Sequence, residues 1–186
     1  MKNKIILIIM IPLLLLFLEG CFFFGESIED TVPVVDFVDL EKYAGTWYEI
    51  SKLPTWFAKN LVCVTATYTL LENGKIEVLN QGYKESPEGK LSTITGTAWV
   101  PDPNEPARLK VSFFPLISSQ YNIIALDEEN YTYAMVAGKT YKYLWILSRT
   151  PQLDQTIYDS LVQQAEDWGY DISKLKMTPQ ICPENQ

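Results

Sequence analysis

The chain has 186 residues, with 15 Lys or Arg against 23 Asp or Glu and no His, and its formal net charge is −8. Such an acidic protein is a poor ligand for phosphate backbones, which argues against nucleic-acid binding. The lack of His excludes Ser-His-Asp and Cys-His catalysis.

The first 35 residues have the features of targeting segments. Lys2 and Lys4 precede an apolar run, Ile5 to Leu18, which is shorter than the roughly 20 residues that span a bilayer and is typical of a signal peptide. The run leads into Leu18-Glu19-Gly20-Cys21, which resembles a bacterial lipobox and implies lipid attachment at Cys21; Glu19 departs from the usual small or apolar residue. Phe22, by the same resemblance, implies sorting to the outer membrane. The alternatives are an uncleaved anchor helix and ordinary secretion with a free thiol.

We therefore expect a signal peptide over residues 1–20, a tether over 21–35 and one domain over 36–186. About 165 residues remain after cleavage, enough to bury one good core. Without Lys2, Lys4 and Glu19 the mature chain keeps 13 basic and 22 acidic residues, a net charge of −9.

Eight runs in the mature chain have the composition and alternation of β-strands, and short connections suited to an antiparallel meander separate them. The runs cover residues 46–53, 62–71, 75–83, 91–100, 107–114, 121–126, 131–138 and 143–149. Asn73-Gly74 predicts a tight hairpin between the second and third runs.

The period changes after Arg149. Ile157, Leu161, Ala165 and Trp168 recur at steps of four, four and three, which predicts one apolar stripe on a helix. Asp154 can cap the start of this helix and Gly169 can end it.

Trp47 near the start of the first run and Arg149 at the end of the last suggest how the strands close. If these strands meet, the guanidinium can stack on the indole and seal the floor of a barrel. Eight antiparallel strands can enclose one small ligand, and the small inward residues Gly96 and Ala98 would leave space for it. We predict an all-β fold: an eight-stranded antiparallel up-and-down β-barrel with one C-terminal α-helix packed outside.

Cys63 and Cys182 remain once Cys21 is assigned to lipid. In an oxidising compartment they can form a disulfide that ties the C-terminal tail to the second strand. Two free thiols are the alternative. They are too few for a structural zinc site.

Four ordered motifs resemble the lipocalin family, in particular the branch of bacterial outer-membrane lipocalins and apolipoprotein D. They are Tyr43-Ala-Gly45-Thr-Trp47-Tyr-Glu-Ile, Cys63-Val-Thr-Ala-Thr-Tyr68, Glu72-Asn-Gly-Lys-Ile-Glu-Val-Leu-Asn80 and Tyr143-Leu-Trp-Ile-Leu-Ser-Arg149-Thr-Pro. The resemblance covers residues 36 to 184. Leu126-Asp127-Glu128 departs from the Thr-Asp-Tyr that is frequent in the family. The resemblance implies a Cys63–Cys182 disulfide and a small hydrophobic ligand.

The parity of the last strand and the resemblance together indicate a ligand site. If Trp47 and Arg149 face inward, so do Trp145 and Leu147. The resemblance adds five inward positions. The predicted ligand-binding residues are Tyr68, Val78, Asn80, Phe113, Tyr121, Trp145 and Leu147. They form an apolar cup with a few polar groups, suited to a long-chain amphiphile such as a fatty acid or lysophospholipid; for each aromatic taken alone, ordinary barrel core is the alternative.

Three residues, Gly45, Trp47 and Arg149, are assigned to barrel closure. The carboxylate of Glu49 shares the parity of Trp47, and it could meet either Arg149 or a ligand.

Trp56, Phe57, Leu116 and Ile117 lie in two connections that a meander places at one end of the barrel. They could contact a membrane surface or fold back as a lid. We expect no enzymatic activity, cofactor or metal, and a monomer or homodimer. The expected function is lipid transport, storage or repair in the bacterial cell envelope; the alternative is a ligand-free structural or assembly lipoprotein.

Overall fold

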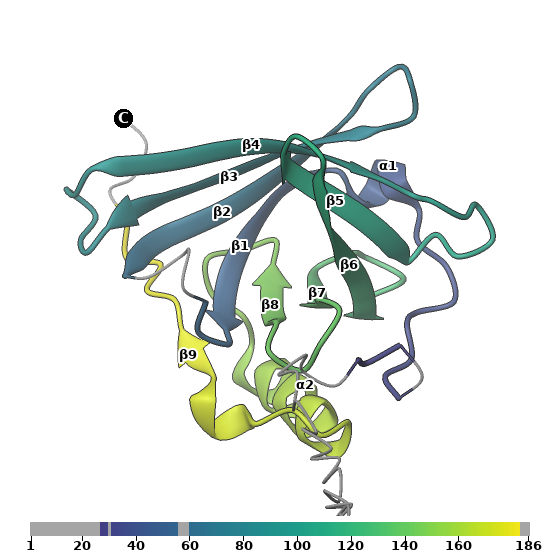
Figure 1. Cartoon of the computed structure of the whole chain (residues 1–186). Coiled ribbons are helices and arrows are strands. Elements are labelled where there is room, and N and C mark those ends of the chain that lie inside the picture. Colours follow the sequence, from purple (N-terminus) through teal and green to yellow (C-terminus); the bar gives the residue numbers. More distant parts are fainter. Residues whose placement is uncertain (1–26, 30, 56–59, 183–186) are drawn as a thin grey trace, which may run out of the picture.

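A computed structural model describes residues 27–29, 31–55 and 60–182, and its strands close into a barrel (Figure 1). Successive strands from β2 to β8 pair antiparallel, and β1 pairs with both β8 and β2. The strands are β1 (Gly45–Lys52), β2 (Leu61–Leu70), β3 (Ile76–Lys84), β4 (Leu91–Trp99), β5 (Arg108–Phe114), β6 (Ile117–Leu126), β7 (Tyr133–Ala137) and β8 (Leu144–Ser148). This arrangement confirms the predicted eight-stranded antiparallel barrel.

The barrel wall separates two apolar clusters. Inside it, an inner cluster is built around Trp47, Leu109, Val136 and their neighbours. Outside it, the alternate residues of the same strands, such as Met135 and Ile146, pack in a second cluster with the C-terminal helix. Because side chains alternate along these strands, apolar residues cover both the inner and the outer face of the barrel wall where the C-terminal helix packs.

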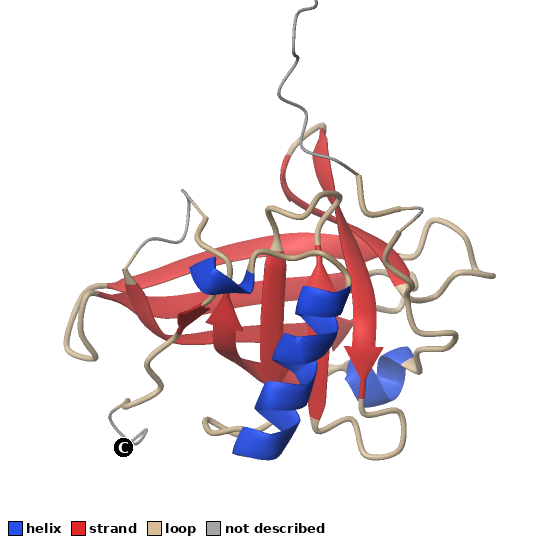
Figure 2. Cartoon of the chain, turned by 90° about the horizontal axis from the view of Figure 1, so that it is seen from below, coloured by secondary structure: helices blue, strands red, loops and turns tan. Residues whose placement is uncertain are grey.

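The C-terminal helix α2 (Gln155–Asp167) lies against the outside of the barrel (Figure 2). Its Leu161 and Ala165 are buried in the outer cluster. The Asp154 carboxylate accepts hydrogen bonds from two backbone N–H groups of the first turn, and Gly169 follows the helix with φ +92°. The predicted helix, its N-cap and its glycine stop are all present. No helix in residues 27–29, 31–55 and 60–182 is long and apolar enough to cross a bilayer.

The described residues before the barrel pack against it. In the described part of that segment, Ile28 and Val32 are buried in the outer cluster. The Ile28 N–H donates to Lys139 O at 3.0 Å. Two apolar residues four positions apart thus attach this segment to the domain. A short helix, α1 (Leu40–Tyr43), follows and is capped by Asp39. Cys21, Trp56 and Phe57 lie outside the described residues.

A ninth strand that the sequence did not predict, β9 (Lys176–Met177), completes the sheet beside β1. Pairing between β1 and β2 ends at Tyr48 and Thr65. Beyond that point β9 takes the free edge of β1, after the 3₁₀ turn Ile172–Lys174. The C-terminal segment, residues 176–182, therefore lies between the two strands where they diverge.

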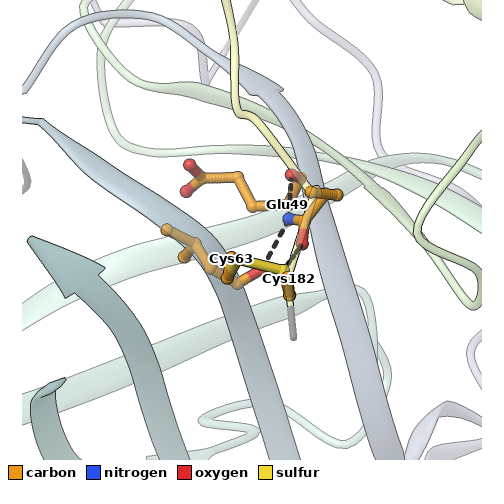
Figure 3. Close-up of a disulfide and its surroundings, with 5 residues drawn as sticks. Glu49, Cys63 and Cys182 are labelled. Atoms are coloured by element: carbon orange, nitrogen blue, oxygen red, sulfur yellow. Dashed lines mark hydrogen bonds between the residues drawn. A yellow bond between two sulfur atoms is a disulfide. The ribbon is translucent and has the colours of Figure 1, made fainter. Parts of the chain in front are cut away.

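Side-chain and disulfide bonds hold this segment to both strands (Figure 3). The Gln180 amide donates to Glu49 O at 2.8 Å and to Val64 O at 3.0 Å, and so joins β1 to β2. Next to it, Cys63 and Cys182 form a disulfide with their Cα atoms 5.7 Å apart. The disulfide that the sequence implied is confirmed.

Candidate ligand-binding site

The floor of the barrel is a stack of Arg149 on Trp47. The guanidinium carbon lies 3.9 Å from the indole centroid, a distance at which cation–π attraction is strong. The guanidinium also donates to five backbone carbonyls, those of Lys42, Tyr43, Ala44, Thr46 and Tyr131. Trp47 is 0% exposed and donates its indole N–H to Tyr43 O at 2.8 Å. This end of the barrel is closed.

Gly45 allows the guanidinium to come this close. Its φ of +96° is the left-handed conformation that only glycine adopts without strain, and a Cβ at this position would lie 3.3 Å from Arg149 Nη1. The geometry at Gly45, Trp47 and Arg149 fits the closing role proposed for them.

Three tyrosines lie just above the floor. The Tyr121 hydroxyl is 2.7 Å from the Tyr43 hydroxyl and 2.8 Å from the Tyr68 hydroxyl. Burial raises the pKa of Tyr68 to about 12, although the hydrogen bond with Tyr121 and the charge of Arg149 lower it. Burial also raises the pKa values of Tyr43 and Tyr121. The three hydroxyls therefore stay protonated at neutral pH. They form two hydrogen bonds with one another, so one of the three O–H donors has no acceptor within the group.

The strand register places the predicted ligand residues on the inner face. Tyr68, Val78 and Leu147 are buried in the inner cluster, and Phe113, Tyr121 and Trp145 pack against it while half-buried. Asn80 is half-buried between Ala66 and Ile94 of the neighbouring strands, and shares the face of Val78. The seven residues thus line one interior.

Burial falls away along the barrel from the floor. Trp47, Ala134 and Val136, near the floor, are fully buried. At the opposite end, which we call the open end, Ile94 is 38% exposed although it pairs with Asn80 on the inner face. Trp145 is also incompletely buried. Solvent therefore reaches apolar side chains inside the wall at the open end.

The space beside Gly96 is not free. A Cβ added there would lie 2.6 Å from the Phe113 ring, so the ring of the opposing residue occupies the room that we expected the glycine to leave. Where β5 diverges from β4, a hollow of about 280 Å³ lies beside Thr95, Phe113 and Phe114. Phe113 is the one predicted ligand residue that lines this hollow.

The carboxylate of Glu49 meets neither Arg149 nor solvent. It accepts a hydrogen bond from Thr178 Oγ1 at 2.5 Å and lies 2.7 Å from Lys52 Nζ. A β-bulge between Glu49 and Ser51 changes the alternation of β1. Ser51 pairs with Ile146 of the outer cluster, and Lys52 pairs with the inward Trp145. Strict alternation from Trp47 would put Ser51 on the inner face, and the bulge turns it to the outer face instead.

The sequence analysis missed several residues of the interior. Tyr43 follows the Asp39 cap, and this signal could have placed it on a short helix under the barrel. The inward position of Lys52 depends on the β-bulge, and no residue pattern in the sequence predicts that bulge. Thr178 lies on a segment too short to show a period. Within the described residues, no three His, Cys, Asp or Glu side chains come together as a metal site.

The hairpin between β5 and β6 exposes apolar side chains. Leu116 is fully exposed at its tip with φ +67°, and Phe114 and Ile117 beside it are mostly exposed. Phe114 pairs with Ile117, so the turn has two residues. Leu116 and Ile117 therefore do not fold back as a lid.

The sealed floor, the accessible inner face and the outer helix together define a cup-shaped antiparallel β-barrel. Residues 38–180 match the sequence profile of a lipocalin-like domain. The chain belongs to the lipocalin family.

Individual relatives agree with this assignment. The chain is 39% identical to outer membrane lipoprotein Blc of Vibrio cholerae, over 85% of this chain and 90% of that protein. It is 40% identical to mouse apolipoprotein D, over 82% of both chains. Among solved structures, insecticyanin of the tobacco hornworm has the same fold, with 23% identity, a TM-score of 0.65, and coverage of 83% of this chain and 86% of that chain.

Proposed function

We propose that this protein binds and carries a small hydrophobic amphiphile inside the barrel, above the Trp47–Arg149 floor. The observation that supports this most is the accessible inner face at the open end. Apolar side chains such as Ile94 and Trp145 face the barrel interior and are only partly covered. Exposed apolar surface gains stability when a hydrocarbon chain covers it. A fatty acid or lysophospholipid has such a chain and a polar head.

The proposed contacts are the seven inward residues, which combine apolar walls with a few hydrogen-bonding groups. They are Tyr68, Val78, Asn80, Phe113, Tyr121, Trp145 and Leu147. Near the floor the tyrosine hydroxyls supply a donor, and the Asn80 amide and the Trp145 indole N–H supply others higher up.

The place of action that we propose is the outer membrane of a bacterial envelope. The support is the lipobox-like segment ending at Cys21, and the name of the Vibrio cholerae relative, an outer membrane lipoprotein. A lipid on Cys21 would hold the barrel at the membrane, facing the periplasm, where it could transport, store or repair lipids.

The exposed hairpin tip supports direct loading from the bilayer. Leu116 and Ile117 project from the β5–β6 turn, and Trp56 and Phe57 belong to a connection at the same end in the meander. Replacing all four by Ser should weaken binding of the delipidated protein to phospholipid vesicles. Unchanged vesicle binding would remove loading at the bilayer from the proposal.

The test of carriage is a titration of oleate or lysophospholipid followed by Trp fluorescence. Saturable binding that is lost in Trp145→Ala and weakened in Tyr121→Ala supports the proposal. The second candidate function is a ligand-free scaffold, which the Phe113 ring favours because it fills the space beside Gly96. Absence of binding at micromolar lipid would favour that scaffold.

A further inference from the structure

Lys52 is a buried cation on the inner face of the barrel. It ends β1, and its Cα pairs with that of Trp145, whose side chain packs on the inner cluster. Neighbouring residues on one face of a sheet point the same way. Its side chain is 9% exposed. The bulge after Glu49 thus turns a charged side chain into the barrel at the open end.

Burying an ammonium is costly unless its hydrogens find partners. The Lys52 ammonium has three donors. Within the described part of the chain it meets the Glu49 carboxylate at 2.7 Å, and no acceptor in hydrogen-bonding geometry is found for Nζ. Glu49 Oε1 is shared with Thr178. A single contact leaves N–H groups of Lys52 free for another acceptor.

The two ends of the interior differ in what they offer to a negative charge. At the floor, the Arg149 guanidinium already donates to five backbone carbonyls and stacks on the Trp47 ring. Lys52 lies five residues further along β1, about 16 Å from Trp47 at the usual strand rise. Of these two cations in the described part of the chain, Lys52 is therefore the one with unused donors.

We infer that Lys52 is the headgroup-binding residue for a long-chain amphiphile with a monoanionic head, such as a carboxylate. The inference rests on the proposed function and adds the charge and orientation of the ligand. The anionic head lies against Lys52 Nζ near the open end, and the hydrocarbon chain runs past Trp145 toward the tyrosines. Glu49 limits the site to low charge, because a second negative charge would be repelled by its carboxylate.

The experiment compares oleate with oleyl alcohol, which have the same hydrocarbon chain and differ in the charge of the head. Full-length protein in dilute non-ionic detergent is titrated at pH 8 and followed by Trp fluorescence. Because Lys52→Met leaves Glu49 buried without its cation, the decisive pair is Glu49→Gln against the double variant Glu49→Gln/Lys52→Met. The Gln side-chain oxygen can still accept from Thr178, so the pair differs only in the ammonium.

We expect the double variant to bind oleate roughly tenfold or more weakly than Glu49→Gln, since a hydrogen bond to a charged group is lost. Its affinity for oleyl alcohol should change less than about twofold. Glu49→Gln should itself bind oleate more tightly than the unsubstituted protein, because a repelling carboxylate is gone. Lys75→Met, which removes an exposed lysine from the β2–β3 turn, is the matched control and should leave both affinities unchanged.

Equal oleate affinities in Glu49→Gln and the double variant would overturn the assignment of Lys52. So would an equal loss for oleate and oleyl alcohol, which would mark Lys52 as a packing residue. If the unsubstituted protein binds neither compound, the proposed function fails with it. Binding of oleyl alcohol with no preference for oleate leaves carriage intact and refutes the headgroup site alone.

Discussion

Replacing Cys63 and Cys182 together by Ala should lower the free energy of unfolding by about 3–5 kcal/mol. The disulfide joins residues 119 positions apart. For a loop of that length, the chain-entropy relation gives about 16 cal/mol/K of entropy removed from the unfolded chain, or about 4.9 kcal/mol at 25 °C. The measurement is urea unfolding under non-reducing conditions, followed by Trp fluorescence. Because the unfolded state becomes less compact, the dependence on urea should also steepen.

Gln180→Ala separates the cross-link from the docking of the C-terminal segment. It removes the two hydrogen bonds to Glu49 O and Val64 O and keeps the disulfide, so its expected cost is about 1–2 kcal/mol. If the double Cys variant loses no more free energy of unfolding than Gln180→Ala, the disulfide does not stabilise the protein by restraining the unfolded chain. A loss below about 1 kcal/mol would refute the calculation outright.

Three further changes test the barrel. Arg149→Ala should cost about 2–4 kcal/mol in thermal or urea unfolding, because five carbonyls and the Trp47 face lose a partner; a cost as small as that of Lys75→Ala would contradict the role of the floor. Tyr68, with its pKa raised to about 12, should ionise later than an unfolded tyrosine near pH ~10. Its contribution to stability is fully present below that pH and is lost as the pH rises from about 10 to 12, so a phenolate absorbance difference between the protein and Tyr68→Phe that titrates near pH ~10 would exclude its burial. Gly96→Ala should destabilise by about 1–3 kcal/mol because its Cβ meets both the Phe113 ring and the Ser112 carbonyl oxygen at 2.6 Å, and Gly96→Ala/Phe113→Leu, which relieves only the ring contact, should recover part of that loss.

The sequence predicted the barrel because each strand carries its own signal. Eight runs with period-2 alternation and an Asn-Gly turn are local features, and so is the helix stripe that Asp154 and Gly169 bound. All eight strands and the helix lie within a few residues of their predicted limits. The largest shift is the start of β6, at Ile117 rather than Tyr121. Its first residues after Ile117, Ser118 to Gln120, are polar and mostly exposed, so only pairing with β5 makes them part of the strand.

The features that were missed depend on contacts between distant segments. The β9 strand is two residues long and exists because β1 and β2 diverge. The inward turn of Lys52 follows from one extra residue in β1, and a single bulge reverses every later position of a strand. Glu49 was expected to meet Arg149 or a ligand, but its carboxylate accepts from Thr178, which lies 129 residues away. Strand periodicity cannot indicate such a pairing.

The insertion of the C-terminal segment between β1 and β2 makes closure of the barrel depend on the end of the chain. The strands β2 to β8 pair with their neighbours in sequence and can form as the chain emerges. The open end of the seam, in contrast, needs residues 176–182, which are the last part of the described chain to be made. Such distant contacts form late because loop closure must be overcome first. The Trp47–Arg149 floor is also a distant contact, with hydrogen bonds between residues 103 to 107 positions apart, so both ends of the barrel close only after most of the chain has been made.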